Sequence, residues 1–208
     1  EEYKWESQQV FQDHWDIEAP DFAQMYENSL QNTETRRLWK GQNFFPKEKM
    51  ARLIRFQPDF ARRMFRDLFD ESKSIESRKS RFLFGCDSLL QDYKTAHPHS
   101  IENNHDHENN HIISMYLAFH YPQNYTLFFY PEFKAFMQKL KVTQLPSPYD
   151  FERFCKISRT LNTFLNKDPD IPGLIARKLH PDRHYKAPSL LLVHDFYWCC
   201  TRPEFGIQ

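Results

Sequence analysis

The sequence predicts a mainly α-helical protein with a small β component, an α+β fold in which a compact helical module carries one short aromatic strand or hairpin. The chain has only 4 Gly but 13 Pro. Tight hairpins need glycine at positive φ, whereas helices bounded by proline do not. Apolar residues also recur at helical spacing through most of the chain. Residues 125–130 are instead a short aromatic run, which favours a strand.

The N-terminal half is expected to be a series of helices. Residues 3–15 form the first, and Pro20 lies where the second begins, with an apolar face running from Phe22 to Leu30 and an end at Gly41. Two more helices, with apolar stripes on residues 50–54 and 60–69, join at Gln57-Pro58. A helix over residues 75–93 is less clear, because Gly85 lies inside it.

The C-terminal half is expected to be mixed. Residues 112–119 form a buried segment of undefined type, residues 125–130 a strand, and residues 132–140 a helix. After a turn at residues 146–148, the stripe from Phe151 to Leu165 predicts a clean amphipathic helix that ends near residues 167–169. The last apolar run, residues 190–200, fits either a buried helix or a strand, since periodicity cannot separate the two.

Length and composition indicate one folded module over residues 1–208. A subdivision into a helical part, 1–95, and a mixed part, 112–208, joined by a polar loop at 96–111, is also compatible with the sequence. A hydrophobic content of 40% with no net charge is not typical of disorder. No apolar run is long enough to cross a membrane and no secretory signal begins the sequence, so a cytoplasmic location with reduced cysteines is expected.

Several blocks of sequence resemble one known family. They are residues 3–6 and 15–23, 43–46, 64–71, 113–125 and, more weakly, 188–196. In this order of aromatic, acidic and proline residues the chain resembles the N-terminal region of McrB-like AAA+ motor proteins, of the methylcytosine-directed restriction type. The resemblance implies a role in antiviral defence and places a nucleotide-hydrolysing motor after this region. It implies no catalytic residue within it.

The chain itself is expected to be non-catalytic. A phosphate-binding loop needs closely spaced glycines followed by Lys and Ser or Thr, and the four glycines here are isolated. Cys155, Cys199 and Cys200 lie on or at the end of apolar runs, which is typical of buried cysteines rather than of activated thiolates. No catalytic residue and no cofactor are predicted.

Charge is distributed unevenly along the chain. Residues 1–33 hold eight acidic and one basic residue (net −7), whereas residues 34–81 hold fourteen basic and seven acidic residues (net +7). A DNA-binding surface is the functional interpretation of the second segment. The alternative is that its cations are solvated or pair with the acidic segment. The residues predicted to contact DNA are Arg52, Arg55, Arg62, Arg63, Arg66, Arg78, Lys79 and Arg81.

The polar loop is rich in histidine: His97, His99, His105, His107 and His111, with Asp106 and Glu108 among them. A loop of Asn and His with no nearby cysteine pair lacks the rigidity that fixes a tetrahedral ion. The pattern therefore favours a solvated surface loop with at most adventitious metal affinity, and no metal ligand is predicted. His180 and His184 are separated by Pro181, which favours a turn.

The predicted function is a recognition or assembly module of a restriction system that contributes contacts to DNA. One alternative is a protein-interaction module that docks a partner subunit, a motor domain or a phage protein through its acidic N-terminal segment and its aromatic residues. Another is a metal-dependent hydrolase built on the histidine loop. Aromatic residues at positions 93, 121, 125, 128 and 130 are candidates for base stacking, although an aromatic core explains them more simply.

Overall fold

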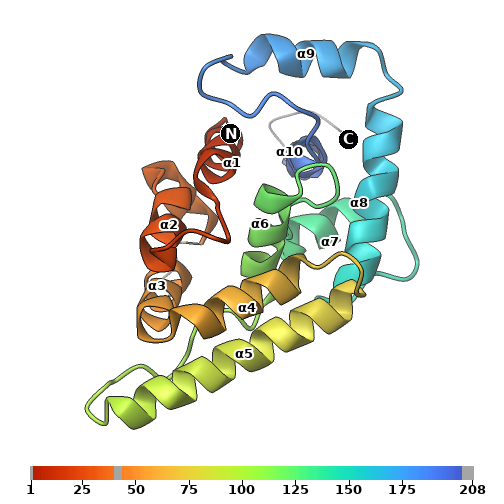
Figure 1. Ribbon diagram of the computed structural model, residues 1–208. Coiled ribbons are helices and arrows are strands. Elements are labelled where there is room, and N and C mark those ends of the chain that lie inside the picture. Colours follow the sequence, from red (N-terminus) through yellow and green to blue (C-terminus); the bar gives the residue numbers. More distant parts are fainter. Residues whose placement is uncertain (1, 40–43, 203–208) are drawn as a thin grey trace. The chain divides into compact units, whose positions relative to one another are not determined.

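The computed structural model describes residues 2–39 and 44–202 and is mainly helical (Figure 1), which confirms the predicted helical class. Its described part contains no β-strand, so the predicted β component is wrong. The elements are α1 (Tyr3–His14), α2 (Phe22–Ser29), the 3₁₀ helix η1 (Thr33–Leu38), α3 (Pro46–Phe56), α4 (Pro58–Phe69), α5 (Ile75–Ala96), α6 (Asn110–His120), α7 (Tyr130–Lys139), α8 (Phe151–Leu165), α9 (Asp170–Lys178) and α10 (Leu191–Cys200).

The chain divides into two compact units. Residues 1–8 and 114–208 form unit 1, and residues 9–113 form unit 2. The boundary lies close to residue 112, where the predicted mixed part begins. The histidine-rich loop belongs to unit 2, however, and the first turns of α1 belong to unit 1.

The helices of unit 2 begin where proline and capping residues direct them. Asp21 accepts a hydrogen bond from the backbone N–H of Gln24 at 2.9 Å and caps α2. Pro46 and Pro58 occupy the first turns of α3 and α4, which confirms the predicted pair of helices. The second helix ends at Ser29, earlier than predicted, and the expected end at Gly41 lies outside the described residues.

The helix that Gly85 made uncertain is the longest one, α5, which runs beside α4 (Figure 1). Gly85 has no side chain, and the side chain of Met64 on α4 packs directly against its backbone. A Cβ added at Gly85 would lie 2.7 Å from Cγ of Met64. The glycine therefore permits close approach of two helices rather than marking a break.

Replacing Gly85 by Ala should destabilise the protein. The added methyl group would improve helix propensity by about 1 kcal/mol, but overpacking against Met64 should cost about 1–3 kcal/mol. Gly173 in α9 is the matched control, because nothing lies within 4 Å of a Cβ placed there. Denaturant unfolding should show G85A less stable than wild type and G173A equal or more stable. A stabilised G85A would contradict the described packing.

Unit 1 is built around helices of high apolar content. Helix α6 is buried from Ile112 to Phe119, which explains why periodicity could not assign the segment: all of its faces are covered. The apolar run at residues 190–200, for which the sequence allowed either a strand or a helix, forms helix α10. Val193, Tyr197 and Cys200 lie on its buried side. Helix α10 packs against α7 and α8, and α8 spans the predicted residues.

The predicted strand at residues 125–130 is wrong: the segment is irregular chain, and at two positions a side chain, rather than a neighbouring strand, bonds its backbone. The N–H of Phe128 donates to Oγ of Ser114 at 2.8 Å, and the hydroxyl of Tyr197 donates to the carbonyl of Leu127 at 2.5 Å. The ring of Phe128 packs 4.4 Å from that of Phe154 on α8. An aromatic run can thus be buried as irregular chain where side chains from other segments bond its backbone groups.

Within the described ranges, no helix combines the length and the apolar character that crossing a membrane requires. This agrees with the absence of a membrane-spanning run in the sequence.

Candidate functional site

Most of the predicted DNA-contacting residues are engaged inside unit 2. Two of them pair with the acidic N-terminal segment: Nη2 of Arg55 lies 2.5 Å from a carboxylate oxygen of Glu27, and Nη2 of Arg66 donates to both oxygens of Glu18 at 2.6 and 2.7 Å. The two opposite charge blocks therefore neutralise each other in part, as the alternative interpretation of the sequence expected.

Two further arginines bind backbone carbonyl groups. Arg62 donates to the carbonyls of Ile17 and Ala19, the latter at 2.8 Å. Arg78 is 2% exposed and donates to the carbonyl of Leu68 at 2.9 Å. Both guanidinium groups act as structural ties between segments of unit 2, and a buried arginine such as Arg78 is not available to a phosphate.

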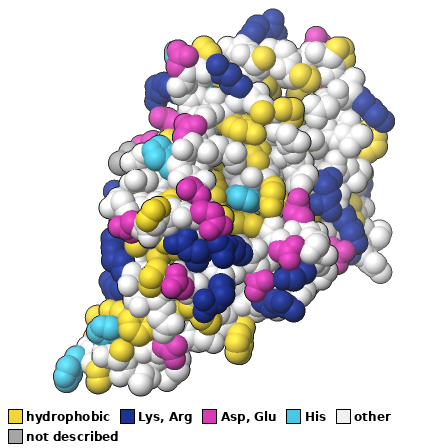
Figure 2. Space-filling view, viewed as in Figure 1, with side chains coloured by type: hydrophobic (Ala, Val, Ile, Leu, Met, Phe, Trp, Pro, Cys, Tyr) yellow, Lys and Arg dark blue, Asp and Glu magenta, His cyan; other side chains and the backbone are white. Residues whose placement is uncertain are grey.

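The last two engaged cations pair with carboxylates of unit 2. Arg52 binds Glu102 of the polar loop, and Nζ of Lys79 lies 2.5 Å from Glu76 one turn earlier on α5. Figure 2 shows dark-blue Lys and Arg side chains with magenta carboxylates between them over the region of α4 and α5. Carboxylates therefore neutralise much of the predicted positive surface.

Arg63 and Arg81 differ from the other six. Both are exposed, and both line a hollow of about 500 Å³ between α4 and α5, whose floor is formed by Met64 and Gly85. Two aromatic residues complete it: Phe84 is 73% exposed, and the ring of Phe60 lies 5.6 Å from Cζ of Arg63. We call this hollow the α4–α5 groove.

The groove also contains a carboxylate. Asp67 lines the groove, but its carboxylate pairs with Nζ of Lys73 at 2.9 Å, and Lys73 is not one of the lining residues. The negative charge of Asp67 is therefore neutralised by a cation outside the groove. Sequence reasoning included Arg63 and Arg81 among eight candidates but had no signal that would separate them. That Phe84 is exposed follows only once the buried face of α5 is known, and the sequence did not define that face.

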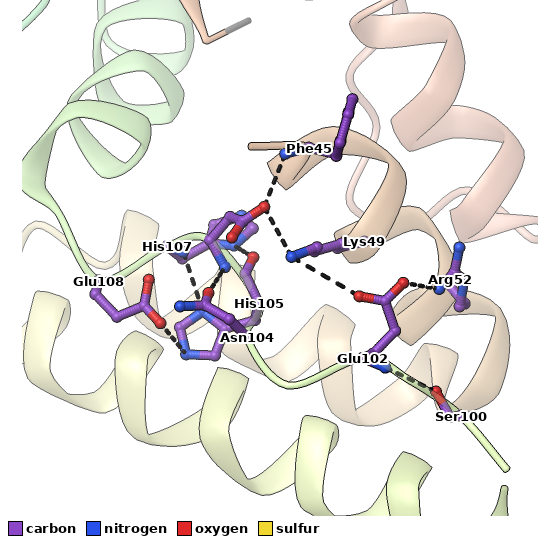
Figure 3. Close-up of polar contacts among 10 residues, drawn as sticks. Phe45, Lys49, Arg52, Ser100, Glu102, Asn104, His105, His107 and Glu108 are labelled. Carbon is purple, nitrogen blue, oxygen red and sulfur yellow. Dashed lines mark hydrogen bonds and ion pairs between the residues drawn. The ribbon is translucent and has the colours of Figure 1, made fainter. Parts of the chain in front are cut away.

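The histidine loop is buried at residues 105–107, which the sequence analysis did not predict. His105, Asp106 and His107 are only 2%, 5% and 0% exposed. The carboxylate of Asp106 accepts a hydrogen bond from the N–H of Phe45 at 2.7 Å and pairs with Nζ of Lys49 at 2.9 Å. In Figure 3, dashed lines from the labelled Phe45 and Lys49 meet at this carboxylate, which carries no label. These partners replace the hydrogen bonds to water that the carboxylate loses on burial. The prediction of a wholly solvated loop is wrong.

Burial also brings a cysteine to two of the histidines. The ligand atoms of Cys86 on α5, His105 and His107 all lie within 4.8 Å of one another. Burial raises the pKa of the Cys86 thiol well above its ordinary value and lowers the pKa of His107 to about 3. His97 and His99 are exposed. His111, at the start of α6, contacts the backbone carbonyl of Leu38.

Unit 1 contains a larger cavity, of about 720 Å³, lined by α8, α9 and residues 186–192. Its lining combines apolar residues such as Trp5 and Ile175 with the amides of Asn162 and Asn166. Lys186 also lines it, and among the described residues of the lining there is no carboxylate, histidine or cysteine. Sequence reasoning missed it because α9 was not predicted.

The remaining predicted features have structural positions. His180 to His184 forms a turn, as predicted, in which Nδ1 of His184 accepts from the N–H of His180 at 2.8 Å. Cys155 and Cys200 are buried and Cys199 is half-buried, and all four cysteines of the chain are free thiols. Of the proposed stacking aromatics, Tyr125 and Phe128 are buried in the core.

Comparison with known proteins adds no assignment. No protein-family model matches the chain, and neither curated proteins nor solved structures give a significant match.

Proposed function

We propose that this chain is a non-catalytic recognition module of a restriction-type defence system, and that it contacts DNA through the α4–α5 groove. The proposal joins the resemblance to McrB-like N-terminal regions with one structural observation. Of the eight predicted DNA-contacting residues, Arg63 and Arg81 have no carboxylate or backbone partner among the described residues, and both line the same groove.

The groove offers two kinds of contact that nucleic acid uses. A guanidinium group presents a planar fork that matches a phosphate, and an exposed aromatic ring provides a face on which a base can stack. Arg63 and Arg81 supply the first, and Phe84 the second. Stacking requires an unpaired base, so single-stranded or locally opened DNA fits the groove better than a closed duplex does. Each stacked base contributes about 1–3 kcal/mol.

Salt dependence of binding tests the number of phosphate contacts. Two contacts predict a slope of log K against log salt of about −1.4 for single-stranded DNA, whereas eight contacts to a duplex would give about −7. Fluorescence anisotropy with an oligonucleotide over a salt series measures this slope. A slope near −7 would indicate DNA contacts by all eight predicted residues and would contradict binding through the α4–α5 groove alone.

Matched charge variants locate the interface. R63Q/R81Q should remove most of the DNA binding, while R55Q/R66Q, which removes the same charge from residues that pair with Glu27 and Glu18, should change it little. Phe84→Ala should weaken binding to single-stranded DNA without loss of fold, because the ring is 73% exposed. Equal losses in the two double variants would contradict the assignment.

The same experiment decides the alternative function. Binding to DNA that is no tighter than that of an unrelated neutral protein would remove the nucleic-acid proposal. The exposed Phe84 beside Arg63 and Arg81 would then support a site for a partner protein with an apolar anchor and acidic neighbours.

A further inference from the structure

The side chains of Cys86, His105 and His107 form a cluster whose composition is unusual for a hydrophobic core. The thiol comes from the middle of α5, and the two imidazoles come from the loop that connects α5 to α6. All three residues are 0–2% exposed. A core that only needed packing volume would be filled by apolar side chains, since buried polar groups cost free energy unless they are partnered.

The spacing of the ligand atoms fits a bound metal ion after a small contraction. They lie within 4.8 Å of one another. Zinc holds sulfur at about 2.3 Å and nitrogen at about 2.0–2.1 Å, so two ligand atoms on one tetrahedral ion are less than about 4 Å apart. Rotamer adjustments of a few tenths of an ångström to one ångström in the three side chains would close the site.

We propose that Cys86, His105 and His107 bind one zinc ion, which ties the loop between α5 and α6 to α5. The donor set of one thiolate and two imidazoles matches zinc better than calcium or magnesium, which prefer oxygen ligands. On binding, the Cys86 thiol gives its proton to solvent and the sulfur forms the bond to the ion. The metal is not reduced or oxidised.

Hydrogen bonds around the cluster already orient one of the ligands. Nδ1 of His107 contacts the backbone carbonyl of His105, so Nδ1 carries the proton and Nε2 carries the lone pair that a metal needs. Metal-bound histidines commonly have this kind of second contact, which fixes the tautomer and the ring direction. The same loop is anchored by Asp106, through Phe45 and Lys49 (Figure 3), so the ligands sit on an ordered segment.

A fourth ligand is available at the edge of the cluster. Nδ1 of His105 accepts a hydrogen bond from the N–H of His107 at 3.1 Å, and its Nε2 donates to Oδ1 of Asp87 at 3.1 Å, so a metal ion on His105 takes the place of one of these two hydrogen bonds. Oε1 of Glu108 lies 4.0 Å from the same Nε2. Both acids are more than half exposed, so one of the two carboxylates can complete the tetrahedron from the solvent side and close the site. Their negative charge also offsets the net positive charge of zinc bound to a single thiolate.

The site is structural rather than catalytic. Its three protein ligands are buried, and the segment it would fix is the connection between two helices. A structural zinc contributes directly to folding because the unfolded chain has no preformed site. The zinc proposal stands independently of the DNA proposal, since it involves neither Arg63 nor Arg81.

Metal analysis of tag-free protein tests the site. After zinc loading and desalting, the wild-type chain should retain one zinc per molecule, and removal of zinc with a chelator should lower the midpoint of thermal unfolding. C86S and H107Q should each lose stoichiometric zinc, with affinity reduced at least ~10- to 100-fold. The matched control is H97Q/H99Q, which removes two exposed histidines of the same loop and should retain the ion.

Cobalt substitution keeps the test decisive if a ligand variant does not fold. Wild-type protein loaded with Co²⁺ should show tetrahedral d–d bands and a thiolate-to-cobalt charge-transfer band, which only a cysteine ligand produces. Two results would overturn the proposal: no stoichiometric binding of zinc or cobalt to wild type, or binding that disappears in H97Q/H99Q and persists in C86S.

Discussion

Replacing Asp195 by Asn is expected to lower the free energy of unfolding by about 3–5 kcal/mol, because the substitution removes the carboxylate charge that pairs with a buried ammonium group. The ammonium group belongs to Lys4, which is 0% exposed. Its Nζ binds Oδ1 of Asp195 and lies 2.8 Å from Nδ1 of His194. The second carboxylate oxygen accepts from Nε1 of Trp5 at 3.1 Å. One carboxylate thus holds two residues of α1 to α10.

The pKa of Asp195 supports a charged pair at neutral pH. Burial acts to raise the pKa of this carboxyl, but the adjacent His194 and the ammonium of Lys4 outweigh it, so the pKa lies well below its ordinary value. A depressed folded-state pKa stabilises the protein above the unfolded pKa, and this contribution is lost as the pH falls through the acidic range. The penalty of D195N should therefore be equal at pH 7 and pH 5, and smaller below about pH 4.

A double-mutant cycle with K4M separates loss of the pair from loss of packing. K4M alone should cost less than D195N, because the carboxylate that it leaves behind is 27% exposed and can be hydrated, whereas the Lys4 ammonium cannot. K4M/D195N should be more stable than D195N. Urea unfolding of the four proteins measures the coupling. Additive effects would show that the pair does not hold the two helices together.

Replacing Phe65 by Ala is the second change with a large expected effect, again about 3–5 kcal/mol. Phe65 on α4 is 0% exposed and lies at the centre of the aromatic core of unit 2. Its ring centroid lies 5.2–6.0 Å from the ring centroids of Trp15, Phe22, Tyr26, Phe69 and Phe82. Truncation removes the buried area and leaves a cavity that five rings cannot fill without moving.

Phe164 is the control for Phe65. It is 62% exposed on α8, so F164A should change the free energy of unfolding by less than about 0.5 kcal/mol. Hydrogen exchange should show the loss in F65A as faster exchange of the amides in α4 and α5, which pack against each other. A cost for F65A close to that of F164A would show that this aromatic cluster does not stabilise unit 2.

Local signals predicted the helices that have local causes. Pro58 marks the junction of two helices that the structure retains as α3 and α4. The apolar stripes of α3, α4 and α8 identified their buried faces, because a helix half in water repeats its pattern every three to four residues. The failures are segments without such a pattern: α6 is buried from residue 112 to residue 119, and the backbone of Leu127 and Phe128 bonds side chains distant in sequence.

Amino-acid order alone determined that the chain is helical and that opposite charges fall in separate blocks, since propensity and composition act over a few residues. Only the tertiary structure decided which charges neutralise each other, which two arginines remain beside an exposed ring, and which histidines meet Cys86. The physical reason is range. Pairing, burial and metal-ligand geometry depend on distances between residues far apart in the chain, and those distances arise only when the helices pack.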